Sequence, residues 1–557
     1  MSDKNARLIY LPLGGAGEVG MNCYIYGYGK PGAERLIVVD LGVTFGDMDS
    51  SPGVDLIMAD IAWLKERNDL IDAIFITHAH EDHIGALQHL WPDLKARVYA
   101  RKFTAAIGEA KLAEAGLKSS ILKVVGAYPE QVKAGPFSVS FLPISHSIPE
   151  SAGLVIDTPA GRVVHTGDFK LDPTPGVGEA WDPVLWGEVA KPGVKALICD
   201  STNVHVARPG RSEATIVDPI SALIKSASGL VAATTFASNV ARLKTLATAA
   251  QMAGRSVVLL GRAMNTMVET ALRTGVVTDF PRVLSPEEAA DVPRDHLMIL
   301  ATGSQGERRA AIAQLSRGKF LGFELTEGDT VLYSSRVIPG NEKFVIKIMN
   351  AFSERGVTVV EDHDGSYHVS GHANGPDLVT MHQVMKPQMV IPMHGDHRML
   401  TAHKVLAQGQ GIASIVATNG TMLDLSGSHP RVVDQIDTGR TYLDGKVLIG
   451  AMDGVIRDRI RLALNGLIVV TTIIDERGRP LGDPWCDVMG LPETGRSNAA
   501  LIEVLEEDLS QFLGRAEKKT LADDEKLEEA LSQVARKSAE AEIGRKPEVL
   551  VVVSRLQ

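Results

Sequence analysis

The densest group of metal-binding side chains in this sequence is the stretch His78-Ala79-His80-Glu81-Asp82-His83. It directly follows an apolar segment, residues 73–77, that is expected to form a buried strand. Imidazole and carboxylate ligands together suit zinc or manganese, and the absence of a nearby cysteine argues against a structural thiolate site. Three of the chain's 16 histidines fall within these six positions, so a chance run of polar loop residues explains the stretch poorly. It predicts a metal site at the end of a strand.

Three further side chains of the same chemical types stand at the ends of other expected strands. They are His146 in Ser145-His146-Ser147, Asp168 in His165-Thr166-Gly167-Asp168, and His394 in Pro392-Met393-His394-Gly395. Taken one at a time, each is explained equally well as a hydrogen-bonded loop residue. Taken in order behind residues 78–83, they resemble the ligand series of the metallo-β-lactamase superfamily.

That resemblance implies two divalent metal ions, zinc or manganese, in one site. One ion would be held by His78, His80 and His146, the other by Asp82, His83 and His394, with Asp168 bridging the two. Two close metals acidify a shared water and stabilise the attacking and leaving oxygens of a phosphodiester. The arrangement therefore suits hydrolysis. Lactamases and thioesterases of the glyoxalase type use it too, so it does not name the substrate.

The secondary structure expected around these residues changes along the chain. Up to about residue 200, short apolar strands separated by turns dominate, with a helix expected over residues 102–115. From about residue 229, strands alternate with helical segments, which predicts a mostly parallel sheet flanked by helices. Residues 210–375 are therefore predicted to form a second α/β unit. It fills the interval between Asp168 and His394, which are 226 positions apart.

An α/β insert before the last metal-binding histidine resembles the β-CASP nucleases, and five further motifs resemble the ribonuclease J family. The motifs are Asp200-Ser201-Thr202-Asn203, Thr235-Phe236-Ala237-Ser238-Asn239, Thr302-Gly303-Ser304-Gln305-Gly306-Glu307, Ile338-Pro339-Gly340-Asn341 and Ser370-Gly371-His372. The resemblance covers about residues 8–450 and, more loosely, the tail. It implies an α/β fold, the αββα sandwich of the metallo-β-lactamases with an inserted β-CASP α/β domain and a small C-terminal α/β domain. The implied ranges are 1–209 and 376–428 for the lactamase domain, 210–375 for the insert, 429–455 for a linker and 456–557 for the C-terminal domain.

The resemblance also implies an activity. We expect a metal-dependent ribonuclease that hydrolyses single-stranded RNA as a 5′-to-3′ exonuclease preferring 5′-monophosphate ends, with endonuclease activity as a further option, in RNA processing and decay. Asp82 and His372 are the implied catalytic residues. The implied substrate-contacting residues are Phe236, Ala237, Ser238, His368, Val369, Ser370, Gly371 and His372.

Some of these roles have a physical basis and a simpler alternative. Small or hydroxyl-bearing residues such as Ser238, Ser370 and Gly371 let backbone N–H groups approach phosphate oxygens closely. His372 would steady the phosphate or protonate the leaving oxygen, its alternative being an ordinary turn histidine. For Ser238, the cap of a helix beginning at Val240 is an equally good interpretation. A position that supports a ligand or lies on the surface is favoured over ligation for His165, His363, His368 and His397.

Three other functions compete with this one: a DNA-directed β-CASP nuclease, a small-molecule metallo-hydrolase, and an RNA-binding scaffold with a dead site. The motifs at 302–307 and 370–372 favour RNA over DNA. The large insert weighs against a small substrate, and the complete ligand series weighs against a dead site.

The charge balance limits how RNA could be held. The chain has 57 Lys and Arg against 68 Asp and Glu, a net charge of −11. This charge argues against a protein that coats nucleic acid through an overall basic surface. A focused basic groove remains compatible with it. The basic residues expected in such a groove are Arg242, Arg262, Arg308 and Lys343.

Two other motifs are given weaker interpretations. The glycine pattern of residues 15–20, with Asp40 20 positions after Gly20, fits a dinucleotide-binding fingerprint. Such a fingerprint must open a helix, whereas residues 21–27 have a strand pattern, so a hairpin turn is favoured. Asp47 and Asp49, with Asp444, are candidates for an additional structural cation, although a solvated acidic loop is the favoured interpretation.

Composition points to a compartment. The three cysteines are far apart, which fits a reducing cytosol. No apolar stretch is long enough to cross a membrane, and residues 1–5 lack the apolar core of a secretory signal. We therefore expect a cytoplasmic enzyme with no membrane association. By resemblance, we further expect a homodimer or homotetramer formed through the C-terminal domain, and protein partners from RNA decay.

Overall fold

The computed structural model describes residues 5–338 and 340–556; residues 1–4, Pro339 of the 338–341 motif and residue 557 lie outside this description. The described chain forms two compact units. The first comprises the residues up to Thr44 and Ile57–Arg440, and the second comprises Phe45–Leu56 and the residues from Thr441 onward. No helix in the described part is long and apolar enough to span a membrane.

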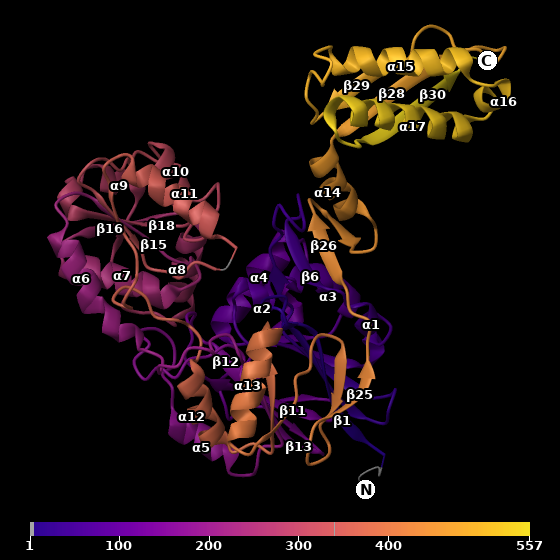
Figure 1. Cartoon of the computed structure of the whole chain (residues 1–557). Helices are drawn as coiled ribbons and strands as arrows, with labels where there is room; N and C mark the ends of the chain where they lie inside the picture. Colours follow the sequence, from indigo (N-terminus) through magenta and orange to yellow (C-terminus); the bar gives the residue numbers. More distant parts are fainter. Residues whose placement is uncertain (1–4, 339, 557) are drawn as a thin grey trace. The chain divides into compact units, whose positions relative to one another are not determined.

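Two mixed sheets lie face to face in the first unit (Figure 1). The first has the order β25-β24-β1-β3-β4-β7-β8-β9 and the second β10-β11-β12-β13-β14-β21-β23. The strands of the first sheet are β1 (Arg7–Gly14), β3 (Cys23–Gly29), β4 (Arg35–Val39), β7 (Ile71–Ile76), β8 (Val98–Ala100), β9 (Leu122–Val124), β24 (Thr421–Asp424) and β25 (Arg431–Gln435). Those of the second are β10 (Val132–Ala134), β11 (Phe137–Pro143), β12 (Ala152–Thr158), β13 (Gly161–His165), β14 (Ala196–Asp200), β21 (Met389–Met393) and β23 (Ala413–Ser414).

One apolar core fills the space between these sheets. It includes Tyr26 and Phe75 from the first sheet and Phe141, Ile198 and Ile391 from the second, all at most 1% exposed. A second core joins the outer face of the second sheet to α5 (Pro183–Ala190), α12 (Gly375–Met385) and α13 (His397–Gly409). On the other side, α4 (Lys102–Glu114) packs against β8 and β9. This is the αββα arrangement expected from the sequence.

The insert forms its own α/β layer structure. Its six-stranded sheet has the order β17-β16-β18-β15-β19-β20, and all its pairings are parallel. The strands are β15 (Val231–Thr234), β16 (Ser256–Leu260), β17 (Val283–Leu284), β18 (Leu297–Ala301), β19 (Thr330–Tyr333) and β20 (Thr358–Val360). Strand β18 is apolar and buried throughout, as expected for a parallel strand covered on both faces.

Helices cover both faces of this inserted sheet (Figure 1). One face packs against α6 (Val217–Ser226), α7 (Val240–Met252) and α8 (Arg262–Thr274). The other packs against α9 (Pro286–Ala290), α10 (Ala311–Arg317) and α11 (Glu342–Ser353). The alternation of strands and helices predicted for this region is therefore present.

The second unit contains a β-hairpin strand β27 (Val447–Gly450), helix α14 (Val455–Asn465) and a three-stranded sheet in the order β29-β28-β30. Its strands are β28 (Leu467–Ile474), β29 (Trp485–Met489) and β30 (Glu548–Arg555). Helices α15 (Leu501–Arg515) and α17 (Asp524–Ile543), with the short α16 (Lys518–Leu521), cover one face through leucines at helical spacing.

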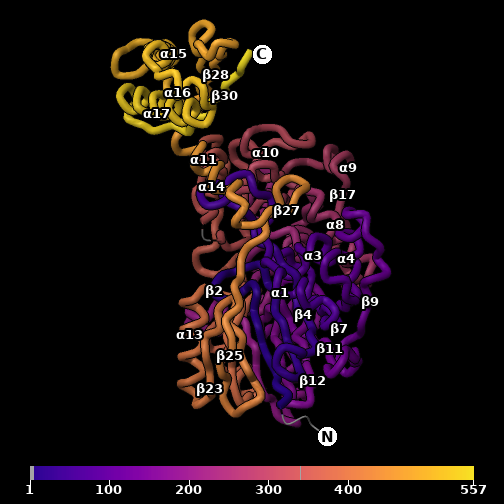
Figure 2. Tube along the Cα trace, turned by 90° about the vertical axis from the view of Figure 1, so that its right-hand side faces the viewer, coloured from indigo at the N-terminus to yellow at the C-terminus, as the bar shows by residue number. Residues whose placement is uncertain are grey.

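The structure corrects the linker predicted at residues 429–455. Strand β25 pairs with β24 and so belongs to the first sheet, although its residues are turn-rich in sequence. Figure 2 shows this late segment, in orange, alongside the indigo strands from the start of the chain. The lactamase domain therefore extends past residue 428.

Candidate metal centre

The strands that carry the expected ligands deliver them to one edge of the sandwich. Strands β13, β14 and β21 are parallel, and β11 runs in the same direction because it is antiparallel to β12, which is antiparallel to β13. His146, Asp168 and His394 follow the carboxyl ends of β11, β13 and β21, and Asp200 is the last residue of β14. The 78–83 stretch follows β7 in the facing sheet, and its Asp82 and His83 lie in the short helix α2 (Glu81–Ile84).

A close backbone approach sets the position of α2. Gly42 lies against it so tightly that a Cβ on Gly42 would be 1.7 Å from the carbonyl oxygen of Asp82. The same oxygen accepts a hydrogen bond from Nδ2 of Asn22 at 2.9 Å. A glycine is therefore required at position 42 for Asp82 and His83 to reach the site.

The seven expected metal ligands come together in two adjoining groups. His78, His80 and His146 form one, and Asp82, His83, Asp168 and His394 form the other. The ligand atoms within each group all lie within 4.8 Å of one another. In the first group, Nε2 of His78 and Nε2 of His146 each lie 3.1 Å from Nδ1 of His80.

Asp168 lies between the two groups. Its Oδ2 is 3.2 Å from Nε2 of His83 in one group, and 3.9 Å from Nε2 of both His78 and His146 in the other. Its Oδ1 is buried and has no hydrogen-bond partner among the described residues. A buried carboxylate oxygen left without a partner is costly unless a cation or water satisfies it, so this residue fits a position that bridges two ions.

The outer nitrogens of four ligand histidines are held by other side chains or backbone. Nδ1 of His83 lies 2.8 Å from Oδ2 of Asp40, Nδ1 of His146 lies 2.6 Å from the carbonyl oxygen of Gly371, and Nδ1 of His394 lies 2.8 Å from Oγ1 of Thr202. Nδ1 of His78 lies 3.0 Å from Oγ1 of Thr77. Metal-binding histidines in proteins are oriented by such partners. The nitrogen and oxygen donors, without thiolate, fit two zinc or manganese ions.

The protonation of the histidines differs between the groups. Burial and the neighbouring imidazoles lower the pKa of His78 and His146, and burial lowers that of His80 to about 4. These three are therefore neutral, which is the form that binds a metal. Burial opposes the charge of His394 as well, but Asp168, Asp200 and Asp82 outweigh it and raise its pKa to about 10. In this group, a metal cation would take the place of the proton.

Sequence reasoning missed Asp40 and Asp200. Asp40 was considered only as part of the rejected nucleotide fingerprint, yet it accepts hydrogen bonds from Thr77 and holds His83. Its φ of +64° and that of His394, +50°, are unusual for these residues, and such strain is typical of functional sites. The available signal was position: Asp40 and Asp200 both stand at the ends of strands, as the ligands do.

His372 lies beside the two metal groups. Its Nδ1 is 2.8 Å from Oδ2 of Asp200, and its ring stacks at 5.6 Å on that of His394. Its side chain is 22% exposed, against 2% for the bridging candidate Asp168, so it is more accessible than that ligand. Burial alone would lower the pKa of His372, but the Asp200 carboxylate raises it. His372 can therefore act as a proton donor next to the centre.

The remaining substrate-contacting candidates fall in two segments. Gly371 contacts His146 and Ser147 so closely that a Cβ would meet both at about 3 Å, while Oγ of Ser370 accepts a hydrogen bond from Nδ2 of Asn203 at 2.7 Å. Phe236, Ala237 and Ser238 are partly exposed in the loop between β15 and α7. The helix cap is Asn239, whose side chain accepts the N–H of Arg242 at 2.9 Å, so the structure removes the capping role considered for Ser238.

Two other expectations change with the structure in view. Arg242 is fully buried, so it cannot line an RNA groove, whereas Arg262, Arg308 and Lys343 are exposed. The candidate cation residues are not gathered: Asp47 caps its own loop through the N–H groups of Asp49 and Ser50, and Asp444 pairs with Arg459 at 2.6 Å. Among the described residues they belong to no group of three metal-binding side chains.

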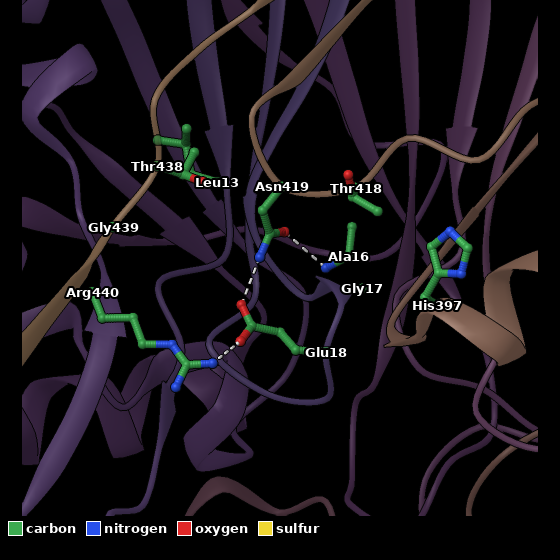
Figure 3. Close-up of a pocket in the computed structure, with 10 residues that line it drawn as sticks. All are labelled: Leu13, Ala16, Gly17, Glu18, His397, Thr418, Asn419, Thr438, Gly439 and Arg440. Carbon is green, nitrogen blue, oxygen red and sulfur yellow. Dashed lines mark hydrogen bonds and ion pairs between the residues drawn. The ribbon is translucent and has the colours of Figure 1, made fainter. Parts of the chain in front are cut away.

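The glycine turn at residues 15–20 is not a nucleotide-binding loop. Ala16–Gly17 (β2) pairs with Gly395–Asp396 (β22), directly after His394, and no helix follows the turn. A cavity of about 340 Å³ borders it, and three of its charged or amide side chains bind one another. Figure 3 shows Glu18 joining Asn419 and Arg440, at 2.5 and 2.8 Å. The turn therefore supports the strand that carries His394.

Known proteins match every part of this architecture. Four family models cover the chain: metallo-beta-lactamase superfamily at 16–219, ribonuclease J beta-CASP domain at 228–352, Zn-dependent metallo-hydrolase RNA specificity domain at 365–417, and ribonuclease J C-terminal domain at 454–556. Ribonuclease J of Sinorhizobium meliloti is 40% identical over 99% of this chain and 98% of its own. The chain belongs to the ribonuclease J family.

More distant comparisons agree with that assignment. Ribonuclease J of Thermus thermophilus is 32% identical over 98% of this chain and 94% of its own. A solved structure from Enterococcus faecalis V583, of unknown function, covers 75% of this chain and 100% of its own with a TM-score of 0.52 and 16% identity, and so shares the fold alone. As a ribonuclease J family member with a β-CASP insert, the chain is a hydrolytic nuclease that binds divalent metal ions.

Proposed function

We propose that this enzyme hydrolyses single-stranded RNA in the 5′-to-3′ direction, prefers 5′-monophosphate ends, and takes part in RNA processing and decay in the cytoplasm. Zinc or manganese would occupy the two groups of ligands. The observation that carries the proposal is the contact of residues 368–372 with the centre, where Gly371 binds His146 and His372 binds Asp200. The segment expected to contact nucleotide thus adjoins the ligands expected to hold the metals.

Each residue of the centre would have a metal-binding or a proton-transfer role. His78, His80 and His146 would hold one ion, Asp82, His83 and His394 the other, and Asp168 would bridge them. Two such ions activate water and stabilise negative charge on a phosphodiester. Asp82 and His372 would handle protons, His372 giving one to the leaving oxygen, as its raised pKa and its hydrogen bond to Asp200 favour.

Substrate contacts would come from both segments at the insert. The hydroxyl of Ser370 and the backbone N–H groups of Ser370 and Gly371 would bind phosphate oxygens. His368 and Val369 would contact the substrate beside them. The loop of Phe236, Ala237 and Ser238 would contact a nucleotide. Exposed Arg262, Arg308 and Lys343 would attract the RNA strand, which predicts salt-sensitive capture by a protein of net negative charge.

We further propose that two or four copies associate through the C-terminal domain, and that proteins of RNA decay are further partners. The outer face of the sheet β29-β28-β30 supports self-association, because it carries exposed apolar side chains: Trp485 is 63% exposed, Met489 73% and Leu550 55%. Several exposed apolar side chains on one face are typical of interaction sites.

The test uses pure protein with manganese and a single-stranded RNA bearing a labelled 5′-monophosphate. Label released at once as mononucleotide supports the 5′ exonuclease, and longer labelled fragments mean endonuclease cleavage. A matched DNA strand tests dependence on the 2′-hydroxyl; equal cleavage of DNA would favour the DNA-directed alternative. Two intact strands in the presence of bound metal would favour a small-molecule hydrolase.

The double substitution Asp82→Ala, His83→Ala tests the centre. We expect it to abolish hydrolysis while RNA binding, measured by fluorescence anisotropy, largely survives, because the RNA contacts lie elsewhere. His296→Ala, an exposed histidine of the insert, serves as the control and should match the native enzyme. Undiminished cleavage by the double variant would refute the assignment of the metal ligands.

A further inference from the structure

A buried network of charged groups lies behind residues 368–372. Arg242 of α7 is fully buried, and its guanidinium donates to both carboxylate oxygens of Glu213 at 2.6 and 3.0 Å. It also donates to the carbonyl oxygen of Ser334 at 2.8 Å, to Nδ1 of His368 at 3.0 Å and to the carbonyl oxygen of Val369 at 3.1 Å. One side chain thus joins four segments of the chain.

The network continues from Glu213 to the loops of the metal centre. The backbone N–H of Glu213 donates to Oδ2 of Asp172 at 2.9 Å, and Nζ of Lys170 pairs with the same carboxylate at 2.8 Å. Lys170 and Asp172 are 4% and 1% exposed. Oγ of Ser145 donates to the carbonyl oxygen of Lys170 at 2.8 Å, and Ser145 precedes the metal ligand His146.

The segment that this network reaches has little structure of its own. Residues 361–372, all within the described range, lie outside helices and strands. They are anchored from outside: Ser334 donates to the carbonyl oxygen of Tyr367 at 2.6 Å, Arg242 binds His368 and Val369, and Nδ1 of His146 binds the carbonyl oxygen of Gly371. Its position therefore depends on side chains from distant parts of the chain.

We propose that Arg242 is a positioning residue that holds residues 368–372 against the metal centre, with Glu213 as its essential counterion. The role rests on the proposed function of that segment in RNA cleavage. By donating to Nδ1 of His368, Arg242 also fixes the orientation of that ring and places its proton on Nε2. A buried guanidinium with several hydrogen-bond partners is held in one orientation, and it therefore fixes the segments that accept its hydrogen bonds.

The insert contains a matched control in Arg255, which is also buried at 6% exposure. Its guanidinium donates to carbonyl oxygens of Gly229, Ala227, Ile224 and Leu297, all outside residues 368–372 and the metal centre. Arg242→Lys and Arg255→Lys remove the same fork geometry from the same domain. Only the first touches the proposed network.

The two variants are compared on two substrates, with melting temperature and bound metal measured alongside. We expect Arg242→Lys to lower kcat on RNA about 100-fold, the order that a displacement of about 1 Å can cost. Its kcat on bis(p-nitrophenyl) phosphate, a small phosphodiester, should stay within about threefold of the native value. The p-nitrophenolate leaving group needs no proton, and all metal ligands are retained. Arg255→Lys should leave the ratio of the two activities unchanged. The proposal would be overturned if the ratio of RNA hydrolysis to bis(p-nitrophenyl) phosphate hydrolysis were the same in Arg242→Lys as in Arg255→Lys.

A second measurement does not depend on RNA cleavage. Hydrogen–deuterium exchange in peptides covering residues 366–374 should be faster in Arg242→Lys than in Arg255→Lys, and it should also be faster in Glu213→Gln than in the native enzyme, because that substitution leaves the buried Arg242 without its counterion. Unchanged exchange in both network variants would refute the positioning role. If the native enzyme cleaved no RNA, the proposed function would fail, while this exchange comparison would still decide the role of Arg242.

Discussion

Individual acids around the metal centre act through the histidines they hold. Asp40 binds the outer nitrogen of His83, and Asp200 binds His372. Both acids are buried, and each orients its partner ring toward the shared site. A carboxylate that holds a histidine in this way sets both the ring's orientation and its basicity. The chemistry of the site therefore depends on more residues than the seven ligands.

His372→Ala tests the proton donor proposed at this scale. We expect kcat on RNA to fall about 10²–10⁴-fold, the usual contribution of a general acid, with unchanged bound metal and little change in melting temperature, since the side chain is partly exposed. The exposed His363 nearby provides the control as His363→Ala. A native rate in His372→Ala with native metal content would remove that residue from the mechanism.

Strands and short helices create the site by ending at the same place. Strands β11, β13 and β14, together with β21, deliver their following residues to one edge, and β7 delivers α2 from the facing sheet. Loops at the ends of rigid strands can hold several side chains at defined distances. The packing of α2 against Gly42 is the tightest point of this arrangement.

Gly42→Ala tests that packing. Because the added methyl would meet the carbonyl oxygen of Asp82 at 1.7 Å, α2 must move and carry Asp82 and His83 with it. We expect metal affinity at least ~10-fold weaker, of the size seen when the support of a ligand is lost, measured by competition with a chelator. Gly187→Ala in α5 is the control, since among the described residues no atom outside its own helical turns lies within 4 Å of its added methyl. Equal metal affinity in the two variants would contradict this account.

At the scale of the whole molecule, the catalytic residues and the proposed association surface belong to different units. All seven ligands and His372 lie in the first unit, and the apolar outer face of β29-β28-β30 lies in the second. Its residues share that face because paired positions such as Trp485, Thr471 and Val552 point to the same side. Substitutions on that face therefore leave the seven ligands and His372 unchanged.

The double substitution Trp485→Ser, Leu550→Ser tests this separation. We expect sedimentation velocity to show a smaller species than the native enzyme at the same concentration, while hydrolysis of bis(p-nitrophenyl) phosphate per chain stays within about twofold. Val184→Ser, which removes an apolar side chain 71% exposed in the first unit, is the control and should sediment as the native enzyme does. An unchanged species in the double variant would argue against association through this face.

The sequence alone identified the family, the alternation of strands and helices in the insert, and the residues expected to bind metal. These follow from local patterns: a strand followed by four ligands within six residues, apolar runs at strand spacing, and motifs that are contiguous in the chain. The fold class and family that the resemblance implied agree with the structure and with the known relatives.

Only the tertiary structure decided which distant residues meet. His394 lies 312 positions from Asp82, and Gly371 lies 225 positions from His146, so no local pattern connects them; strand order does. For the same reason Arg242, a plausible RNA contact by charge, is a buried partner of Glu213, and Asp40 and Asp200 gained roles that their neighbours in sequence do not reveal. Local patterns depend on residues a few positions apart, whereas burial and ion pairing depend on how the sheets pack.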